Sequence, residues 1–379
     1  MDNSAWSSQP NSSPPPIRPD DTPPGPQRIV PASRRSKPIG LYALTGCLGV
    51  IVITCACLSF VLASIGPGTL LALRDRWFGR DTGTSIKTIV QVVQVMAGNG
   101  DVWPVPNNGR VVILLMGVDT RGQSVNDPAR SDVIMLATID PATNSAALLS
   151  VPRDLFVPLP NLNAQDRINT AYFWGELNHY PGGGPAYAMA TLSWNLGVPI
   201  QKYGVIDFNG FKAVVDAIGG IDIDVPVTID DYAYPTEDYG VEHLVIPAGR
   251  THMDGSLALK YVRTRHQDSD FGRLERQQQV ILAIRDKALS IGSLNKVPEV
   301  LNALGDSLQT DLTLPEILTL AKKWGSIPKQ NIHTYHIDQM MATSYVTPEG
   351  ADVLLPNRQA IGAIIAQFLG QVTASNVMP

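Results

Sequence analysis

The chain has 379 residues and a formal net charge of −5, so it is long enough for one large domain and additional segments. Beyond the first 38 residues there are 24 basic and 31 acidic residues, a net charge of −7. This balance excludes a general nucleic-acid-binding protein, because neutralising phosphates requires surplus Lys and Arg.

The first part of the chain reads as a tail followed by a membrane span. Residues 1–38 hold ten of the 30 prolines, a composition that predicts a disordered segment. Residues 39–73 carry no charge, and the apolar stretch 41–65 is long enough to cross a bilayer. Arg34, Arg35 and Lys37 precede it, which predicts a cytoplasmic N-terminus and a single-pass protein of the plasma membrane. A cleaved signal peptide is the alternative, but the long polar leader and the length of the apolar run argue against it.

The cysteines restrict the chemistry available after the span. Cys47, Cys55 and Cys57 are the only three in the chain, and all lie within 41–65. The extracytoplasmic part therefore has no disulfide, no thiolate metal site and no catalytic cysteine.

The remaining chain divides into a juxtamembrane stalk, 74–108, and a domain, 109–379. Short apolar runs bounded by turn residues predict strands, and apolar residues at helical spacing predict helices. The predicted strands are 111–117, 132–140, 146–151, 201–208 and 221–225. The predicted helices are 184–196, 209–218 with Asn209 as N-cap, 254–262, 270–289, 297–308, 315–324 and 357–369. Strands mixed with covering helices indicate an α/β domain of α-β-α layers around one mixed sheet.

Charged residues concentrate at the ends of the first three predicted strands. These positions are Asp119, Arg121, Arg130, Asp132, Arg153 and Asp154. A later segment, 261–278, places four arginines within fourteen residues, and these are Arg263, Arg265, Arg273 and Arg276. Strand ends and the loops beside them are where α/β domains build their sites.

These residue types suit a pyrophosphate ligand. The guanidinium group offers paired donors that match phosphate oxygens. Asp119 and Asp132 flank neighbouring strands and could together hold Mg²⁺ with substrate oxygens as further ligands. The alternative is structural, because an arginine-rich helix is commonly a solvated face with ion pairs, and Asp at strand ends commonly forms turns and caps.

Seven segments, in order, are similar to one family. They are LLMGVDTR (114–121), RSDVIMLATIDP (130–141), LLSVPRDLFV (148–157), RINTAY (167–172), DFNGFKAVVDAIGGIDIDVP (207–226), LALKYVRTRH (257–266) and DFGRLERQQQVI (270–281). The chain resembles the LytR-CpsA-Psr family of cell-envelope proteins over about residues 110–370. It departs from the pattern at Thr170, where members often have His or Ser.

The resemblance implies roles for individual residues. Asp119 and Asp132 correspond to the carboxylates linked to Mg²⁺ (or Mn²⁺), and Asp154 to a residue that orients Arg153. The pyrophosphate clamp corresponds to Arg121, Arg130, Arg153, Arg263, Arg265 and Arg276, with Arg273 and Gln277 beside it. A tunnel for a polyprenyl chain is expected, lined by the helices 184–197, 208–218 and 274–289.

The implied function is transfer of a glycopolymer from a polyprenyl-pyrophosphate carrier to a wall acceptor, with peptidoglycan expected, through a phosphodiester. The general base is expected to be Asp119 or Asp132, a role that conflicts with metal binding. The partners are thus the lipid-linked glycan, the wall acceptor and the membrane, without nucleic acid. Two alternatives are a pyrophosphatase, in which water replaces the acceptor, and a non-enzymatic envelope regulator. Against the regulator, residues 1–38 contain no DNA-binding motif.

One local prediction follows from the spacing of Arg263 and Arg265. Alternate residues on a helix diverge by about 200°. Both arginines can therefore reach one ligand only if the helix ends near Val262 and the chain continues extended.

Overall fold

The computed structural model describes residues 82–98, 100–119, 129–236, 240–265, 270–290, 300–301 and 304–371. The predicted tail, the predicted span over 41–65 and Arg121 lie outside these residues. Within the described ranges, no helix is long and apolar enough to cross a membrane.

A six-stranded sheet forms the middle layer, in the order β11-β6-β1-β2-β3-β12. β1 pairs in parallel with β6 and β3 with β12, whereas the other neighbours are antiparallel, so the sheet is mixed as predicted. The strands are β1 (Val111–Val118), β2 (Ser131–Asp140), β3 (Ser145–Ser150), β6 (Lys202–Asp207), β11 (Leu308–Thr310) and β12 (Ile332–His336).

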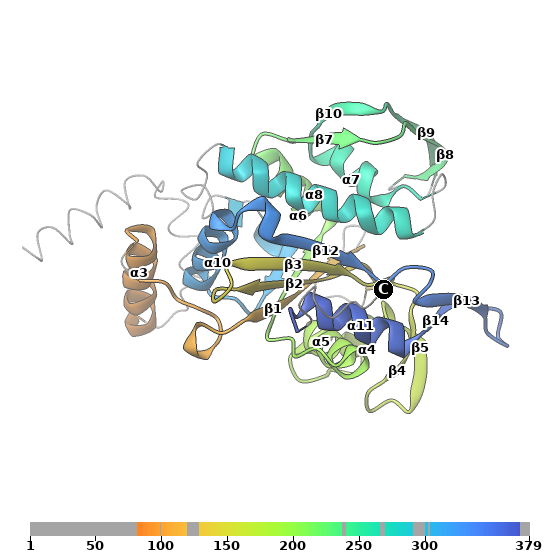
Figure 1. The fold of residues 1–379 in the computed structure, drawn as a ribbon, viewed down its shortest axis with the longest axis horizontal. Helices are drawn as coiled ribbons and strands as arrows, with labels where there is room; N and C mark the ends of the chain where they lie inside the picture. The colour runs from red at the N-terminus through yellow and green to blue at the C-terminus, as the bar shows by residue number, and fades with distance from the viewer. Residues whose placement is uncertain are drawn as a thin grey trace, which may run out of the picture. The chain divides into compact units, whose positions relative to one another are not determined.

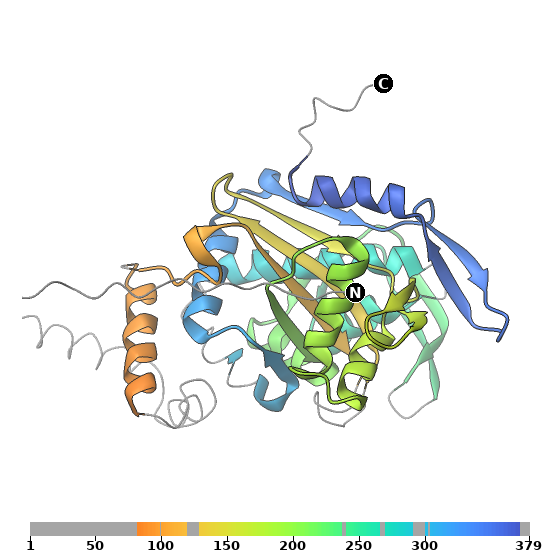
Figure 2. The same cartoon turned by 90° about the horizontal axis from the view of Figure 1, so that it is seen from below.

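Helices cover both faces of this sheet (Figure 1). The helices in the described residues are α3 (Thr82–Met96), α4 (Thr170–Leu177), α5 (Gly183–Leu196), α6 (Phe208–Ala217), α7 (Gly255–Arg263), α8 (Asp270–Ser290), α10 (Leu314–Ser326) and α11 (Arg358–Phe368), and α3 packs beside α10. Single 3₁₀ turns occur at Pro106–Asn108, Gly305–Ser307 and Lys329–Asn331. The green helices α4 and α5 lie on one side of the sheet, which Figure 2 shows from below, and α6, α7 and α8 lie on the other.

The alternation of side chains along β1 explains this layering, because successive residues of a strand point to opposite faces. Val112 and Leu114 are buried in a cluster with residues of α5 and α11. Val111 and Ile113 are buried in another cluster with Leu320 of α10. A strand covered on both faces reads as a continuous apolar run, which is how β1 could be predicted.

Four two-stranded sheets surround the central one, and only one of their strands was predicted. The pairs are β4 (Phe156–Leu159) with β5 (Ala164–Arg167), β7 (Ile221–Val225) with β10 (Gly249–Met253), β8 (Ile229–Pro235) with β9 (Val241–Ile246), and β13 (Ala342–Val346) with β14 (Asp352–Pro356). The predicted strand 221–225 is β7, which pairs with β10 outside the central sheet.

Two local predictions differ from the structure. The N-cap of α6 is Asp207, whose Oδ1 accepts a hydrogen bond from the Gly210 backbone N–H at 2.7 Å, so Asn209 lies inside the helix. β6 passes directly into α6, and its last residue has the extended backbone that an N-cap needs. Leu308, predicted to end a helix, begins β11 instead, and residues 291–299 and 302–303 of that region lie outside the described ranges.

Part of the predicted stalk belongs to the packed domain. Val92 and Val95 of α3 are buried in a cluster with Leu314 and Leu318 of α10. The backbone N–H of Val102 also donates to Thr319 Oγ1 at 3.0 Å. Val92 and Val95 thus join α3 to the same apolar cluster as α10.

Candidate functional site

Three carboxylates meet at one end of the neighbouring strands β6, β1 and β2. β1 and β2 are antiparallel, so Asp119 after β1 lies near Asp132 at the start of β2. β6 runs parallel to β1 and ends at Asp207. All three line a cavity that opens there, and Asp207 also caps α6 through its Oδ1.

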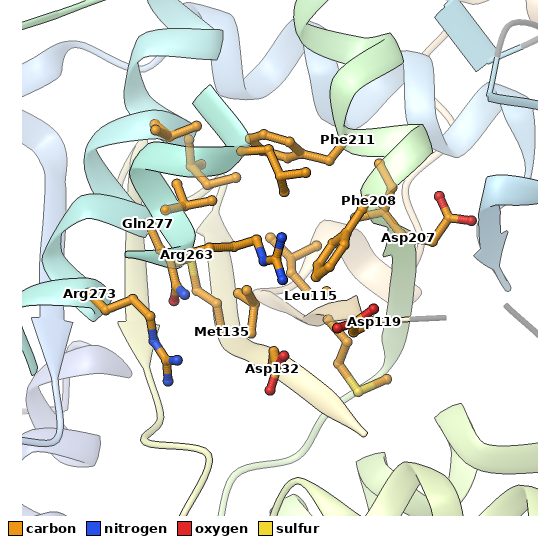
Figure 3. Close-up of a pocket in the computed structure, with 18 of the residues that line it drawn as sticks. Leu115, Asp119, Asp132, Met135, Asp207, Phe208, Phe211, Arg263, Arg273 and Gln277 are labelled. Carbon is orange, nitrogen blue, oxygen red and sulfur yellow. The ribbon is translucent and has the colours of Figure 1, made fainter. Parts of the chain in front are cut away.

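This cavity, called the apolar cavity below, has a volume of about 440 Å³ and lies between the sheet and α6, α7 and α8 (Figure 3). Its size is typical of a small-molecule site. Its apolar lining is Leu115, Met116, Gly117, Val133, Met135, Gly204, Ile206, Phe208, Phe211, Pro235, Leu259, Val262, Val280, Ile281 and Leu308. Its charged or polar lining is Asp119, Asp132, Arg153, Asp207, Arg263, Arg265, Arg273 and Gln277. The lining suits a long apolar chain that carries a charged group at one end.

The end of α7 brings two arginines to this cavity. α7 includes Arg263 as its last residue, one residue later than predicted, and Thr264 then adopts an extended conformation with φ −59° and ψ 144°. Because the chain straightens there, Arg263 and Arg265 both line the cavity. The Arg263 guanidinium stacks on Phe208 at 4.4 Å from the ring centroid, and its Nη1 donates to the Tyr234 hydroxyl at 3.2 Å.

α8 contributes Arg273 and Gln277, which lie one turn apart on the face toward the cavity (Figure 3). Both residues are buried, Gln277 with 4% of its surface exposed. Gln277 Oε1 has no hydrogen-bond partner within the described part of the chain. A ligand in the cavity could bond to this side-chain amide.

Arg276 does not reach the apolar cavity. It is buried on another face of α8, where its Nε donates to the Tyr261 carbonyl at 3.0 Å and its Nη2 to the Thr264 carbonyl. These carbonyls end α7 and need donors from elsewhere. Arg276 therefore holds the turn that carries Arg263 and Arg265, in place of the clamp position implied by the resemblance.

A second cavity of about 430 Å³, called the polar cavity, adjoins the first. Its lining is Asp119, Ala129, Arg130, Asp132, Arg153, Asp154, Arg167, Asn169 and Phe173. Asp119, Asp132 and Arg153 line both cavities. Arg130 is exposed and lines only the polar cavity, so the structure separates it from the arginines of α7 and α8.

Four side chains of alternating charge form one wall of the polar cavity. Arg153 Nη1 lies 2.6 Å from Asp132 Oδ1, and Arg153 Nε lies 3.3 Å from Asp154 Oδ2. Asp154 Oδ1 lies 3.3 Å from Arg167 Nε, and Arg167 also donates to the Asp352 carbonyl at 2.9 and 2.6 Å. Arg153 is thereby oriented from two sides by carboxylates.

Several residues of these cavities were not singled out from the sequence. Arg167 and Asn169 stand in the motif 167–172, which could have pointed to them. Phe173, Phe208, Phe211 and Tyr234 give no signal in the sequence, because an aromatic residue near a cavity looks like any core aromatic.

Of the three helices expected to line the tunnel, two line the apolar cavity and one does not. α6 and α8 line it, as expected for 208–218 and 274–289. α5, expected over 184–197, packs on the opposite face of the sheet, where Leu192 and Leu196 join the cluster of Leu114. The apolar stripe of a helix shows that it is covered but not which face of the sheet covers it.

Asp119 and Asp132 fit a Mg²⁺ or Mn²⁺ ion bound partly by substrate. The described residues contain no cluster of three or more His, Cys, Asp or Glu able to hold a metal ion. Mg²⁺ commonly uses one or two carboxylates, with phosphate oxygens and water completing its octahedron. Two carboxylates lining the same cavity meet that requirement.

Comparisons with known proteins agree with this architecture. The model of the LytR_cpsA_psr family matches residues 81–367. A polyisoprenyl-teichoic acid–peptidoglycan teichoic acid transferase TagU of Oceanobacillus iheyensis is 35% identical over 60% of this chain and 67% of that protein. A TagV of Bacillus subtilis with the same descriptive name is 32% identical over 59% of this chain and 56% of that protein. The matched region thus spans about two thirds of the first relative and little over half of the second.

Solved structures share the fold. The crystal structure of B. subtilis TagV has a TM-score of 0.56 and 27% identity, over 70% of this chain and 100% of that one. The structure of TagT bound to LI-WTA has a TM-score of 0.56 and 25% identity, over 72% of this chain and 93% of that one. Both support the α/β architecture around one mixed sheet.

Proposed function

The chain belongs to the LytR_cpsA_psr family, and on that premise we propose that it transfers a glycopolymer from a polyprenyl-pyrophosphate carrier to a cell-wall acceptor, peptidoglycan being the expected one. The supporting observation is the apolar cavity, whose apolar walls lead to a group of arginines and carboxylates. Such a cavity matches a ligand that joins a hydrocarbon chain to a polyanion.

The two parts of the carrier bind by different forces. The prenyl chain packs on the apolar walls between the sheet and α6 to α8, where each buried CH₂ group contributes about 0.8 kcal/mol. The pyrophosphate oxygens accept hydrogen bonds from Arg153, Arg263, Arg265 and Arg273. Such charge-assisted bonds contribute about 1.5–3 kcal/mol each.

The reaction is a displacement at the sugar-side phosphorus. An acceptor hydroxyl oxygen forms a bond to this phosphorus, and the bond to the bridging oxygen breaks. The bridging oxygen leaves with the electron pair as part of polyprenyl phosphate. The hydroxyl proton passes to a carboxylate oxygen of Asp119 or Asp132 that does not bind the metal ion, and the product is a phosphodiester. The arginines stabilise the charge that develops on the phosphate oxygens.

Asp119 and Asp132 would hold the Mg²⁺ or Mn²⁺ ion. Bound there, the ion would neutralise charge on the pyrophosphate and make its phosphorus easier to attack. Because Arg153 pairs with Asp132 at 2.6 Å, the same arginine keeps this carboxylate oriented toward the shared edge of the two cavities.

The test is dependence on the acceptor. The full-length chain in detergent is given a polyprenyl-pyrophosphate-linked disaccharide, Mg²⁺ and soluble peptidoglycan strands. We expect a phosphodiester-linked product and polyprenyl phosphate in equal amounts. Release of polyprenyl phosphate at the same rate with and without peptidoglycan, and no linked product, would identify a pyrophosphatase instead.

The location completes the proposal, because a lipid-linked glycan and its wall acceptor meet outside the cytoplasm. We place the chain in the plasma membrane through residues 41–65, with the domain on the wall side. A periplasm-type reporter fused after Pro379 should be active, and a cytoplasm-specific reporter at the same position should be silent. The reverse pattern would contradict the location and the proposed reaction.

A further inference from the structure

The polar cavity has no ligand in the scheme above, yet it shares Asp119, Asp132 and Arg153 with the apolar cavity. Its other walls come from the start of α4 and the segments around it. α4 lies on the side of the sheet opposite α7 and α8 (Figure 1). The shared residues therefore stand between two cavities that open toward opposite layers of the domain.

Asn169 is held in the polar cavity by its backbone. Its N–H donates to the Arg153 carbonyl at 3.1 Å, and its carbonyl accepts from the Ser131 N–H at 3.3 Å. It occupies the N-cap of α4 but makes no capping hydrogen bond with its side chain, which is the usual role of Asn at that position.

The Asn169 side chain is instead buried beside the cavity. The residue is only 4% exposed, and its Oδ1 has no hydrogen-bond partner among the residues that the structure describes. A buried polar atom of this kind costs stability unless a partner arrives. An amide both donates and accepts, so a hydroxyl group, which does the same, is a matching partner.

Phe173 stands four residues later on α4, hence on the same face of the helix, and also lines the cavity. It is half-buried, and its ring makes a T-shaped contact with Trp174 at a centroid distance of 5.4 Å. An aromatic ring next to hydrogen-bonding groups suits a sugar ring, which has an apolar face and hydroxyls at its rim.

The geometry of the proposed displacement indicates which sugar, that of the donor or that of the acceptor, binds in the polar cavity. In phosphoryl transfer, the attacking and leaving oxygens lie roughly in line on opposite sides of the phosphorus. If the leaving polyprenyl phosphate lies in the apolar cavity, the attacking hydroxyl must come from the far side of the shared residues. That side is the polar cavity.

Resting on the proposed function, we infer that the polar cavity binds the acceptor saccharide. Asn169 hydrogen-bonds a ring hydroxyl, Phe173 supports the apolar face of the ring, and the attacking hydroxyl is directed to the phosphorus beside Asp119 and Asp132.

The test separates acceptor binding from donor binding. Asn169→Ser and Phe173→Leu are made in the full-length chain, with Asn178→Ser as matched control, because Asn178 is exposed at the other end of α4. Initial rates are measured while peptidoglycan strands or the polyprenyl-pyrophosphate-linked disaccharide are varied in turn. Each site variant should raise the acceptor KM about 3- to 10-fold, as expected for one lost hydrogen bond or ring contact. The donor KM, and Asn178→Ser throughout, should stay within about 2-fold of the unchanged chain.

The outcomes are distinct. An unchanged acceptor KM in both folded variants, with transfer intact, overturns the inference and leaves the proposed function standing. A raised donor KM with an unchanged acceptor KM assigns the cavity to the donor glycan and also overturns it. Absence of any transfer by the unchanged chain contradicts the proposed function, and the inference with it. If Asn169→Ser does not fold, Phe173→Leu decides alone.

Discussion

At the site, individual side chains are held in place by partial burial and by neighbours of opposite charge. The row Arg167, Asp154, Arg153 and Asp132 has side-chain exposures of 18–32%, between those of a surface pair and a core pair. Exposed pairs contribute only about 0–1 kcal/mol, so the row adds little to stability. The row instead fixes the guanidinium group of Arg153 before a ligand binds, which lowers the conformational entropy lost on binding.

Arg265 tests the arginine clamp. Arg265→Ala should slow transfer by roughly 10- to 150-fold, because one charge-assisted hydrogen bond of about 1.5–3 kcal/mol is lost in the transition state. Arg265→Lys should recover little of this, because an ammonium lacks the paired donors of a guanidinium. The control is Lys322→Ala, since Lys322 makes an exposed ion pair with Asp101 away from both cavities. Equal rates for Arg265→Ala and this control would show that Arg265 belongs to a solvated face.

Asp119 tests the proposed metal site. Asp119→Ala should reduce Mg²⁺-dependent transfer by about 10²-fold or more, the usual loss when one electrostatic stabiliser is removed. Its melting temperature should change far less than its activity. Asp101→Ala, a change at an exposed carboxylate, should leave transfer unaffected. Full activity of the unchanged chain in excess EDTA would rule out the two-carboxylate metal site.

At the scale of elements, the end of α7 at Thr264 depends on contacts from two directions. Thr264 Oγ1 donates to Asp231 Oδ2 at 2.6 Å, and Asp231, on β8, is fully buried. From the other side, Arg276 of α8 donates to the carbonyls at the end of α7. The β8–β9 hairpin and α8 thus jointly set where Arg263 and Arg265 point, although neither Asp231 nor Arg276 lines the apolar cavity.

Thr264→Val tests this support with little change of shape. It removes one hydrogen bond to a buried carboxylate, which should lower the free energy of unfolding by about 1–3 kcal/mol. Transfer should also slow at saturating donor and acceptor, because the two arginines lose their fixed spacing. Thr343→Val, at an exposed position of β13, is the matched control. Chemical denaturation and kcat together are the measurement, and a stability loss without any change in kcat would leave the turn with a purely structural role.

At the scale of the whole molecule, two aspartates give the fold opposite dependences on pH. Burial raises the pKa of Asp311 above its ordinary value of 3.8, although the Tyr203 backbone N–H, at 2.9 Å, acts in the other direction. A hydrogen bond from His252 lowers the pKa of Asp222, which is exposed. Ionised Asp311 therefore destabilises the fold, and ionised Asp222 stabilises it.

The directions of these two pKa shifts predict how substitutions of Asp311 and Asp222 change the melting temperature at different pH. The folded state holds the Asp311 proton more tightly than the unfolded state, so its destabilising effect is absent below about pH 3.8 and grows as the pH rises through its folded pKa. Asp311→Asn should therefore raise the melting temperature at pH 7 and not at pH 3.5. Asp222→Asn should lower it at pH 7, and this loss should fade as the pH falls through the folded pKa of Asp222. Parallel pH trends for the two variants would contradict the assignment.

The layers of the molecule could be predicted from its sequence, since they depend on local patterns. The run 111–117 reads as a buried strand because it is apolar on both faces, and 270–289 reads as a helix because its apolar residues recur every three or four positions. The concentration of arginines and carboxylates at strand ends was equally visible, as was the resemblance of the motifs to one family. The local spacing of Arg263 and Arg265 also required the chain to straighten after α7, and it does so at Thr264.

Only the tertiary structure decided which of these residues share a cavity. Arg273 and Arg276 stand three positions apart on α8, yet the packing of α7 turns Arg276 to backbone carbonyls and leaves Arg273 at the apolar cavity. α5 was expected to line the tunnel together with α6 but packs on the other face of the sheet. Asn169 and Phe173 share a cavity with Asp132, and the start of α4 is joined to the start of β2 by the hydrogen bond from the Ser131 N–H to the Asn169 carbonyl. Such contacts join residues far apart in the chain. A local pattern shows that a side chain is buried, but it does not show which residues bury it.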